Sequence, residues 1–130
     1  MTAQQTLAVR PPATWPMWAL KVVAPLHVVA LLFQAVAAGL LLSTPGGRAL
    51  HMTTAVALLV IGIVHVVVAI LVRWPGGEKA TFILPAGILL VATVVQAILG
   101  VAGLKVLHVP LGVLMFHGGV EQLNRVMARQ

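Results

Sequence analysis

The 130-residue chain contains no cysteine. This absence excludes disulfide bonds, iron–sulfur clusters, thiolate-ligated haem and c-type haem attachment, because each of these needs a cysteine sulfur. Acidic residues are nearly absent as well, since Glu78 and Glu121 are the only two. Without paired carboxylates or a nucleophile beside a base, the chain offers almost nothing to hydrolytic chemistry. A cofactor in this chain must therefore be held by nitrogen or thioether ligands.

Charged residues make up only 8% of the chain, about a third of the share in soluble domains, and 61% of the residues are hydrophobic. This composition predicts an integral membrane protein. Four apolar runs, at about 17–43, 50–72, 82–104 and 107–123, fit the roughly 20 residues that a helix needs to cross a bilayer. Short links between the runs predict an all-α, up-down bundle of four transmembrane helices over residues 17–130. Residues 1–16 are polar and proline-rich, which predicts a cytoplasmic tail and no cleavable signal peptide.

The basic residues give the chain a net charge of +6 and lie at the ends of the apolar runs. The positive-inside rule places the side with more lysine and arginine in the cytoplasm. Six basic residues fall on one side and two on the other: Arg10, Lys21, Arg73, Lys79, Arg125 and Arg129 against Arg48 and Lys105. We therefore predict a multi-pass protein of the inner cell membrane with both termini cytoplasmic. No nucleic-acid partner is expected, because membrane topology accounts for these charges.

Two segments of the sequence repeat each other. QAVAAGL at 34–40, followed by ALHMTTAV, is similar to QAILGVAGL at 96–104, followed by VLHVPLGV. The alignment pairs His51 with His108, Ala55 with Gly112, Leu58 with Met115, Gly62 with Gly119 and His65 with Gln122. Gln34 and Gln96 are expected to hydrogen-bond neighbouring helices, or to contact a haem edge or a histidine N–H. Chance similarity between apolar helices is the alternative explanation of the repeat.

His51 and His65 lie fourteen residues apart, close to four helical turns. On a helix both imidazoles therefore point to one side, about 21 Å apart along the axis. Ala55 and Gly62 share that side, and their small size would let a flat cofactor approach the helix. The plain alternative is that each histidine only hydrogen-bonds a neighbouring helix.

The repeat places His51 and His108 at equal depth near the outer face, on helices that lie across the bundle from each other. Two such imidazoles can hold one iron from both sides, with Ala55 and Gly112 making room for the porphyrin. This arrangement predicts a bis-histidine b-type haem site. A zinc or copper ion would need a further ligand, and the outer half offers no acid or cysteine.

Four short motifs point to a known family: Gln-x4-Gly from Gln34, Leu-His at 50–51, Gln-x3-Gly from Gln96 and Leu-His-x3-Gly at 107–112. Together they resemble one four-helix half of heme A synthase, over about residues 26–114. In that family, histidines at the starts of the second and fourth helices of each half are haem ligands, which implies this role for His51 and His108. The chain has one half instead of two and lacks the family's glutamate before the helix-two histidine. The resemblance therefore implies haem binding rather than the synthase reaction.

Three further histidines, His27, His65 and His117, lie at similar depth in the inner half, about 9 to 12 Å from the basic residues at the helix ends. Their positions predict a second haem bound through His65. His27 is the preferred second ligand, because His117 is nine residues after the fourth-helix ligand and points away from the first site on a regular helix. His117 is the alternative ligand, or a histidine that only hydrogen-bonds a neighbour.

The predicted function is that of a small membrane cytochrome b with one haem b, or two, that transfers electrons within or across the membrane. Its partners would be the lipid bilayer and a quinone or a redox partner subunit. One alternative is a half-size relative of heme A synthase, working as a homodimer, that oxidises a haem or an isoprenoid group. The other alternative is a cofactor-free accessory subunit of a membrane complex.

Overall fold

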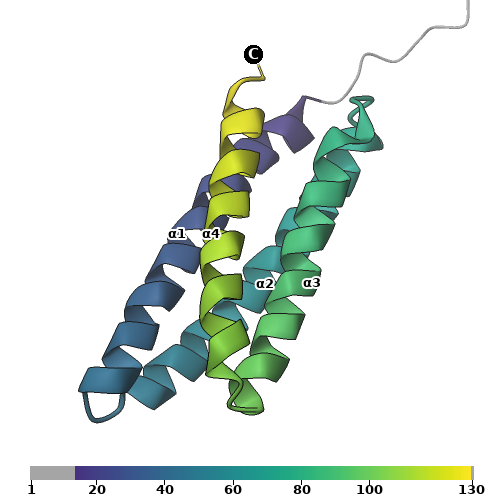
Figure 1. Cartoon of the computed structure of the whole chain (residues 1–130). Helices are drawn as coiled ribbons and strands as arrows, with labels where there is room; N and C mark the ends of the chain where they lie inside the picture. Colours follow the sequence, from purple (N-terminus) through teal and green to yellow (C-terminus); the bar gives the residue numbers. More distant parts are fainter. Residues whose placement is uncertain (1–13, 130) are drawn as a thin grey trace, which may run out of the picture.

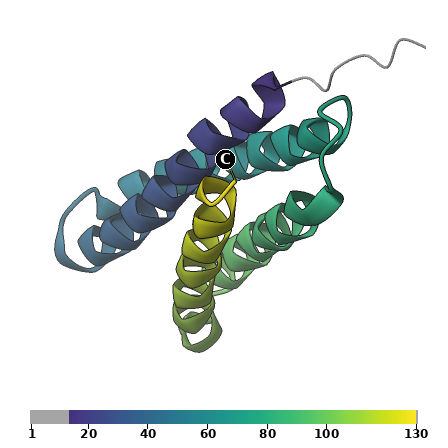
Figure 2. The same ribbon diagram turned by 90° about the horizontal axis from the view of Figure 1, so that it is seen from above.

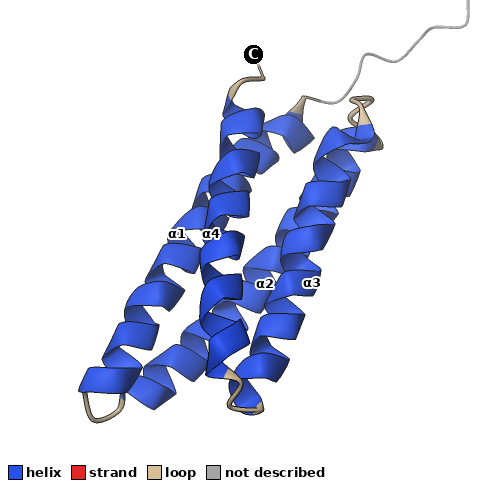
Figure 3. Ribbon diagram, in the orientation of Figure 1, coloured by secondary structure: helices blue, strands red, loops and turns tan. Residues whose placement is uncertain are grey.

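The computed structural model describes residues 14–129, which fold into four long helices and one short 3-10 helix (Figure 1). The elements are α1 (Trp15–Ser43), α2 (Gly47–Arg73), η1 (Ala80–Phe82), α3 (Ile83–Val101) and α4 (Lys105–Met127). Figure 3 shows only helices and connecting loops in this range, so the predicted all-α class is confirmed. Most of the predicted tail, residues 1–13, lies outside the described residues. Trp15 and Pro16 belong to the first turn of α1, where the missing N–H of a proline would have no partner anyway.

Two tight turns join the long helices in pairs. Gly46, between α1 and α2, and Gly103, between α3 and α4, have positive φ angles of 84° and 71°, which glycine adopts without strain. Gly47 must also be small, because a Cβ there would stand 2.1 Å from the Leu40 carbonyl oxygen. These turns fold α2 back along α1 and α4 back along α3. Each pair is therefore an antiparallel hairpin.

The two hairpins pack against each other in the arrangement of Figures 1 and 2. α1 contacts α2 and α4, and α3 contacts the same two helices. α2 and α4 therefore face each other across the bundle. Side chains at matching positions of these two helices meet in the interior, where Leu58 and Met115 share one apolar cluster with Leu31 and Leu89.

A second apolar cluster fills the end of the bundle that holds η1. It consists of Leu20, Ala24, Val68, Ala69, Val72, Phe82, Ala86 and Val126. Three polar side chains, His27, His65 and Gln122, are fully buried on α1, α2 and α4. On each of these helices they lie between the residues of the two apolar clusters. The bundle interior is thus apolar at two levels and polar between them.

Three segments of the described residues are long and apolar enough to cross a membrane: Trp15–Ser43, Gly47–Arg73 and Ala80–Val101. Their outward side chains suit contact with lipid, since Val29, Leu42, Val56, Leu84 and Val101 are all more than half exposed. α4 carries His108, His117, Glu121, Gln122, Asn124 and Arg125, and it does not reach the same apolar content. The chain therefore has the helices of a membrane protein, and a fourth span through α4 stays a prediction.

Candidate functional site

The predicted outer site is formed by His51 of α2 and His108 of α4. The structure brings the two imidazoles together, with ring centroids 6.2 Å apart and ring planes at 66°. His51 is close to the start of α2 at Gly47, and His108 is close to the start of α4 at Lys105, so both lie at the end of the bundle with the two tight turns. Both side chains are half-buried, so part of each ring stays accessible from outside the bundle.

His108 is held by two hydrogen bonds with Gln96 of α3. The Gln96 amide donates from Nε2 to the His108 carbonyl oxygen at 2.7 Å, and His108 Nδ1 lies 3.0 Å from the Gln96 carbonyl oxygen. A carbonyl oxygen can only accept, so Nδ1 carries the ring proton and donates it. Nε2 of neutral His108 then keeps its lone pair, which is the form of histidine that binds a metal.

His51 is held by Gln34 of α1 in a similar way. Gln34 Nε2 donates to the His51 carbonyl oxygen at 3.2 Å and lies 3.3 and 3.4 Å from the two ring nitrogens. The other end of the amide, Oε1, accepts a hydrogen bond from Thr54 Oγ1. Each glutamine therefore bonds the main chain of a histidine on the next helix. These bonds link helices and position histidines at the same time.

Glycines give the His108 ring and the Gln96 amide their space. A Cβ at Gly100 would lie 3.0 Å from His108 Cε1, and a Cβ at Gly112 would lie 2.9 Å from Gln96 Nε2. Gly112, predicted to make room for a porphyrin, thus borders the amide that holds His108. Ala55 lies one turn after His51 and is half-buried, as Gly112 is. Gly100 therefore borders the His108 ring, and Gly112 borders the amide that holds it.

The separation of the His51 and His108 rings can be compared with the separation that one ion held between two imidazoles requires. A ring nitrogen that binds a metal lies about 2 Å from it and about 1 Å from its own ring centroid, so two imidazoles on opposite sides of one ion have centroids about 6 Å apart. The 6.2 Å separation agrees with this value, and it also lies in the range of about 4.5 to 7 Å found for ordinary edge-to-face ring contacts. Among residues 14–129 there is no cluster of three or more histidine or acidic side chains that could hold a metal ion. With two histidines and no third such group among the described residues, the pair does not supply the four protein ligands of a structural zinc ion.

A second polar cluster is buried at mid-bundle. His27 Nδ1 lies 2.8 Å from His65 Nδ1, and Gln122 Nε2 lies 3.1 Å from His65 Nε2. All three side chains are at most 2% exposed. Because the Gln122 amide nitrogen donates, His65 Nε2 accepts, His65 Nδ1 donates to His27 Nδ1, and His27 carries its proton on Nε2. His27 Nε2 and Gln122 Oε1, the two ends of this chain, have no hydrogen-bond partner.

The His27–His65 pair does not have the geometry of the His51–His108 pair. The structure brings His27 and His65 together, but their nitrogens bond each other directly and the ring centroids are 5.1 Å apart. An ion between the rings would require them to separate. A Cβ at Gly62 would lie 3.3 Å from Leu90 Cδ1 and 3.8 Å from His27 Cε1, so side chains already border the space predicted for a cofactor. His117, the alternative ligand, is exposed on α4 and stands outside this buried cluster.

Comparison of the chain with protein-family models, with curated proteins and with solved structures finds no match. The resemblance to one half of heme A synthase therefore stays a prediction from its motifs. The function has to be inferred from the residues of this chain and their geometry.

The sequence alone does not reveal the contacts of three residues in the two clusters, although Gly100 belongs to the Gln-x3-Gly motif and Gln122 to the repeat. Thr54 lies three residues after His51, and Gly100 lies four residues after Gln96, so helical periodicity places each about one turn from a predicted residue. The contact of Gln122 with the buried histidines has a different signal. The repeat aligns Gln122 with a histidine of α2, and the two aligned residues hydrogen-bond each other across the bundle.

Proposed function

We propose that this chain is a membrane-embedded b-type haem protein that binds one haem between α2 and α4 and transfers electrons within or across the membrane. His51 and His108 would hold its iron. The proposal is carried by the 6.2 Å separation of their ring centroids, together with the hydrogen bond that His108 Nδ1 donates to the Gln96 carbonyl oxygen. When bound, a haem supplies one-electron exchange, and the protein supplies its ligands and its surroundings.

The residues around the ligands have distinct roles in this proposal. Gln96 fixes the tautomer of His108 through its main-chain oxygen, which also makes the ring a more basic ligand. Gln34 positions His51, and Thr54 holds the Gln34 amide in place. The half-buried position of both rings leaves access for a cofactor that enters from the side.

A single haem is the better-supported stoichiometry. Binding a second haem through His27 and His65 would break their 2.8 Å hydrogen bond and move rings that are packed inside the bundle. It would also separate His65 Nε2 from the Gln122 amide. The buried cluster of His27, His65 and Gln122 therefore has a role other than holding a haem iron.

All four helices cross the inner cell membrane in this proposal, and both termini are cytoplasmic. The excess of basic residues at the inner helix ends supports the orientation. α4 is the fourth span, and its contacts with α1 and α3 cover part of its polar surface. An internal repeat of two hairpins is the simplest origin of the matched pairs, since His51 meets His108 and His65 meets Gln122.

The test is the absorption spectrum of the purified protein, recorded as a reduced-minus-oxidised difference with the haem content measured alongside. We expect a low-spin, six-coordinate b-type spectrum in the wild type. His51→Ala and His108→Ala should each lose haem or become five-coordinate, because each removes one axial ligand. His117→Ala is the matched control, since His117 is an exposed histidine of α4 outside both clusters. Full haem content with an unchanged spectrum in both ligand variants would show the assignment to be wrong.

A further inference from the structure

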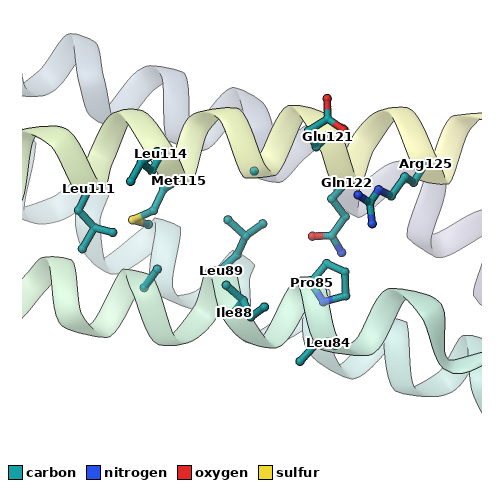
Figure 4. A pocket seen from close by; sticks show the side chains of 12 residues that line it. Leu84, Pro85, Ile88, Leu89, Leu111, Leu114, Met115, Glu121, Gln122 and Arg125 are labelled. Carbon is teal, nitrogen blue, oxygen red and sulfur yellow. The ribbon is translucent and has the colours of Figure 1, made fainter.

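A pocket of about 440 Å³ lies between α3 and α4 (Figure 4). Its walls are mainly apolar and include Leu84, Ile88, Leu89, Leu111, Leu114 and Met115. Its polar side chains, Glu121, Gln122 and Arg125, belong to the last turns of α4. In Figure 4 the Gln122 amide points from α4 into the space between the helices. The pocket is about half open to the surface, and its volume lies within the range of pockets that bind small, mostly apolar ligands through a few polar groups.

The Gln122 amide has an unused hydrogen-bonding atom at this pocket. Gln122 is 2% exposed, and its Nε2 bonds His65 Nε2 and the Phe82 carbonyl oxygen. Its Oε1 is buried and has no partner. An unpaired buried carbonyl oxygen is costly, so this atom favours a ligand that brings a hydroxyl group into the pocket.

The buried histidines also allow the Gln122 amide to donate a hydrogen bond to a ligand that is an acceptor. If the Gln122 amide turns over, its Oε1 accepts from His65 Nε2, and its NH₂ group is presented to an acceptor in the pocket. His65 Nδ1 then accepts from His27 Nδ1, so the bond between the two histidines survives with its direction reversed. Both directions keep the bonds between Gln122, His65 and His27, but the second gives up the 3.4 Å bond from Gln122 Nε2 to the Phe82 carbonyl oxygen. The pocket can therefore pair with a donor or with an acceptor.

We propose that the pocket between α3 and α4 binds the ring of a quinol or quinone, with the Gln122 amide bonded to a ring oxygen and the ring and tail against the apolar walls. This inference rests on the proposed function, because an electron-transferring membrane protein needs a redox partner, and a quinone is one that dissolves in the bilayer. A quinol presents a hydroxyl and a quinone presents a carbonyl, and the reversible chain from Gln122 to His27 suits both. A lipid acyl chain would fill the apolar walls but leave Gln122 Oε1 without a partner.

The experiment measures binding of decylubiquinol and decylubiquinone to the full-length protein in nanodiscs, with empty nanodiscs as background. Gln122→Leu removes the amide at similar volume and should weaken binding of both probes about tenfold or more. Ala92→Phe fills the pocket from α3 without altering the amide and should weaken binding as well. Thr93→Val is the matched control, because Thr93 is buried on the same helix outside the pocket and bonds only the Leu89 carbonyl. It should bind both probes as the wild type does.

The haem spectrum of the same samples separates the two proposals. Loss of probe binding in Gln122→Leu and Ala92→Phe, with haem retained, supports the quinone site. Wild-type affinity in both pocket variants overturns it. Displacement of decylubiquinone by dodecane as effectively as by decylubiquinol also overturns it, since the pocket would then take any lipid tail. A wild-type protein without haem whose probe binding still depends on Gln122 would overturn the haem function alone.

Discussion

Substitution of Gly100 by alanine would test the surroundings of His108 with a single methyl group. The added Cβ would lie 3.0 Å from His108 Cε1 and 3.3 Å from His108 Nδ1. Carbon atoms in ordinary contact are about 3.5 to 4 Å apart, so the ring has to move by about 0.5 to 1 Å. Gly100 and Gln96 are both on α3, so this movement also lengthens the 3.0 Å hydrogen bond between His108 Nδ1 and the Gln96 carbonyl. The substitution therefore displaces the proposed ligand and loosens its support together.

We expect Gly100→Ala to lower the affinity for haem more than it lowers the stability of the bundle. Overpacking costs about 1 to 3 kcal/mol, which corresponds to haem binding weakened by about fivefold to 150-fold. Alanine favours a helix over glycine by about 1 kcal/mol, which offsets part of the effect on the fold. Weaker haem binding with a stability loss of at most about 2 kcal/mol is thus the expected signature of Gly100→Ala.

Gly87→Ala is the control for this substitution, because Gly87 is also on α3 and a Cβ there meets nothing within 4 Å. Haem titration of haem-depleted protein, followed by its Soret absorbance, gives the Kd of the wild type and of both variants. Circular dichroism during heating gives their stability. Equal haem affinity in Gly100→Ala and Gly87→Ala would refute the reasoning, since the His108 ring would then not be held against α3 as a ligand.

Two further predictions concern the buried cluster and the topology. His27→Leu leaves the Nδ1 donor of His65 without an acceptor and should lower the free energy of unfolding by about 1 to 3 kcal/mol. In a double-mutant cycle, the His27→Leu/His65→Leu variant should lose less than the sum of the single variants, and strict additivity in detergent unfolding would count against the bond. Alkaline phosphatase fused after Gln130 should be inactive and green fluorescent protein fused there should fluoresce, because the C-terminus is proposed to be cytoplasmic. The opposite pair of results would reverse the orientation.

The positions of the helices could be predicted because a helix in lipid needs a long apolar run. The run predicted at 50–72 corresponds to α2 at Gly47–Arg73, and the run predicted at 82–104 corresponds to η1 and α3 over Ala80–Val101. The exact helix ends are harder to predict, because they depend on local backbone geometry such as the positive φ of Gly46 and Gly103. α4 is the one long helix among residues 14–129 that does not reach the apolar content of a membrane span, and its polar residues are visible in the sequence.

The outer site was more predictable than the inner cluster. The repeat and the helix starts already place His51 and His108 at one level on facing helices, and the structure brings their rings together. For His27 and His65 the sequence reveals depth and helix face only. Their direct bond depends on how α1 is rotated against α2, and the role of Gln122 depends on the orientation of a side-chain amide. Neither the rotation of α1 nor the orientation of the amide can be inferred from residue spacing, although the repeat aligns Gln122 with His65.

The division of the bundle into two hairpins has a consequence for biogenesis. His51 and the Gln34 bond belong to the first hairpin, and His108 and the Gln96 bonds belong to the second. Each hairpin carries its own turn and its own polar link, so it can enter the bilayer as a closed unit while the rest of the chain is still on the ribosome. Neither unit alone has both imidazoles. The proposed haem would therefore be bound only after the hairpins associate, and its binding would then oppose their separation.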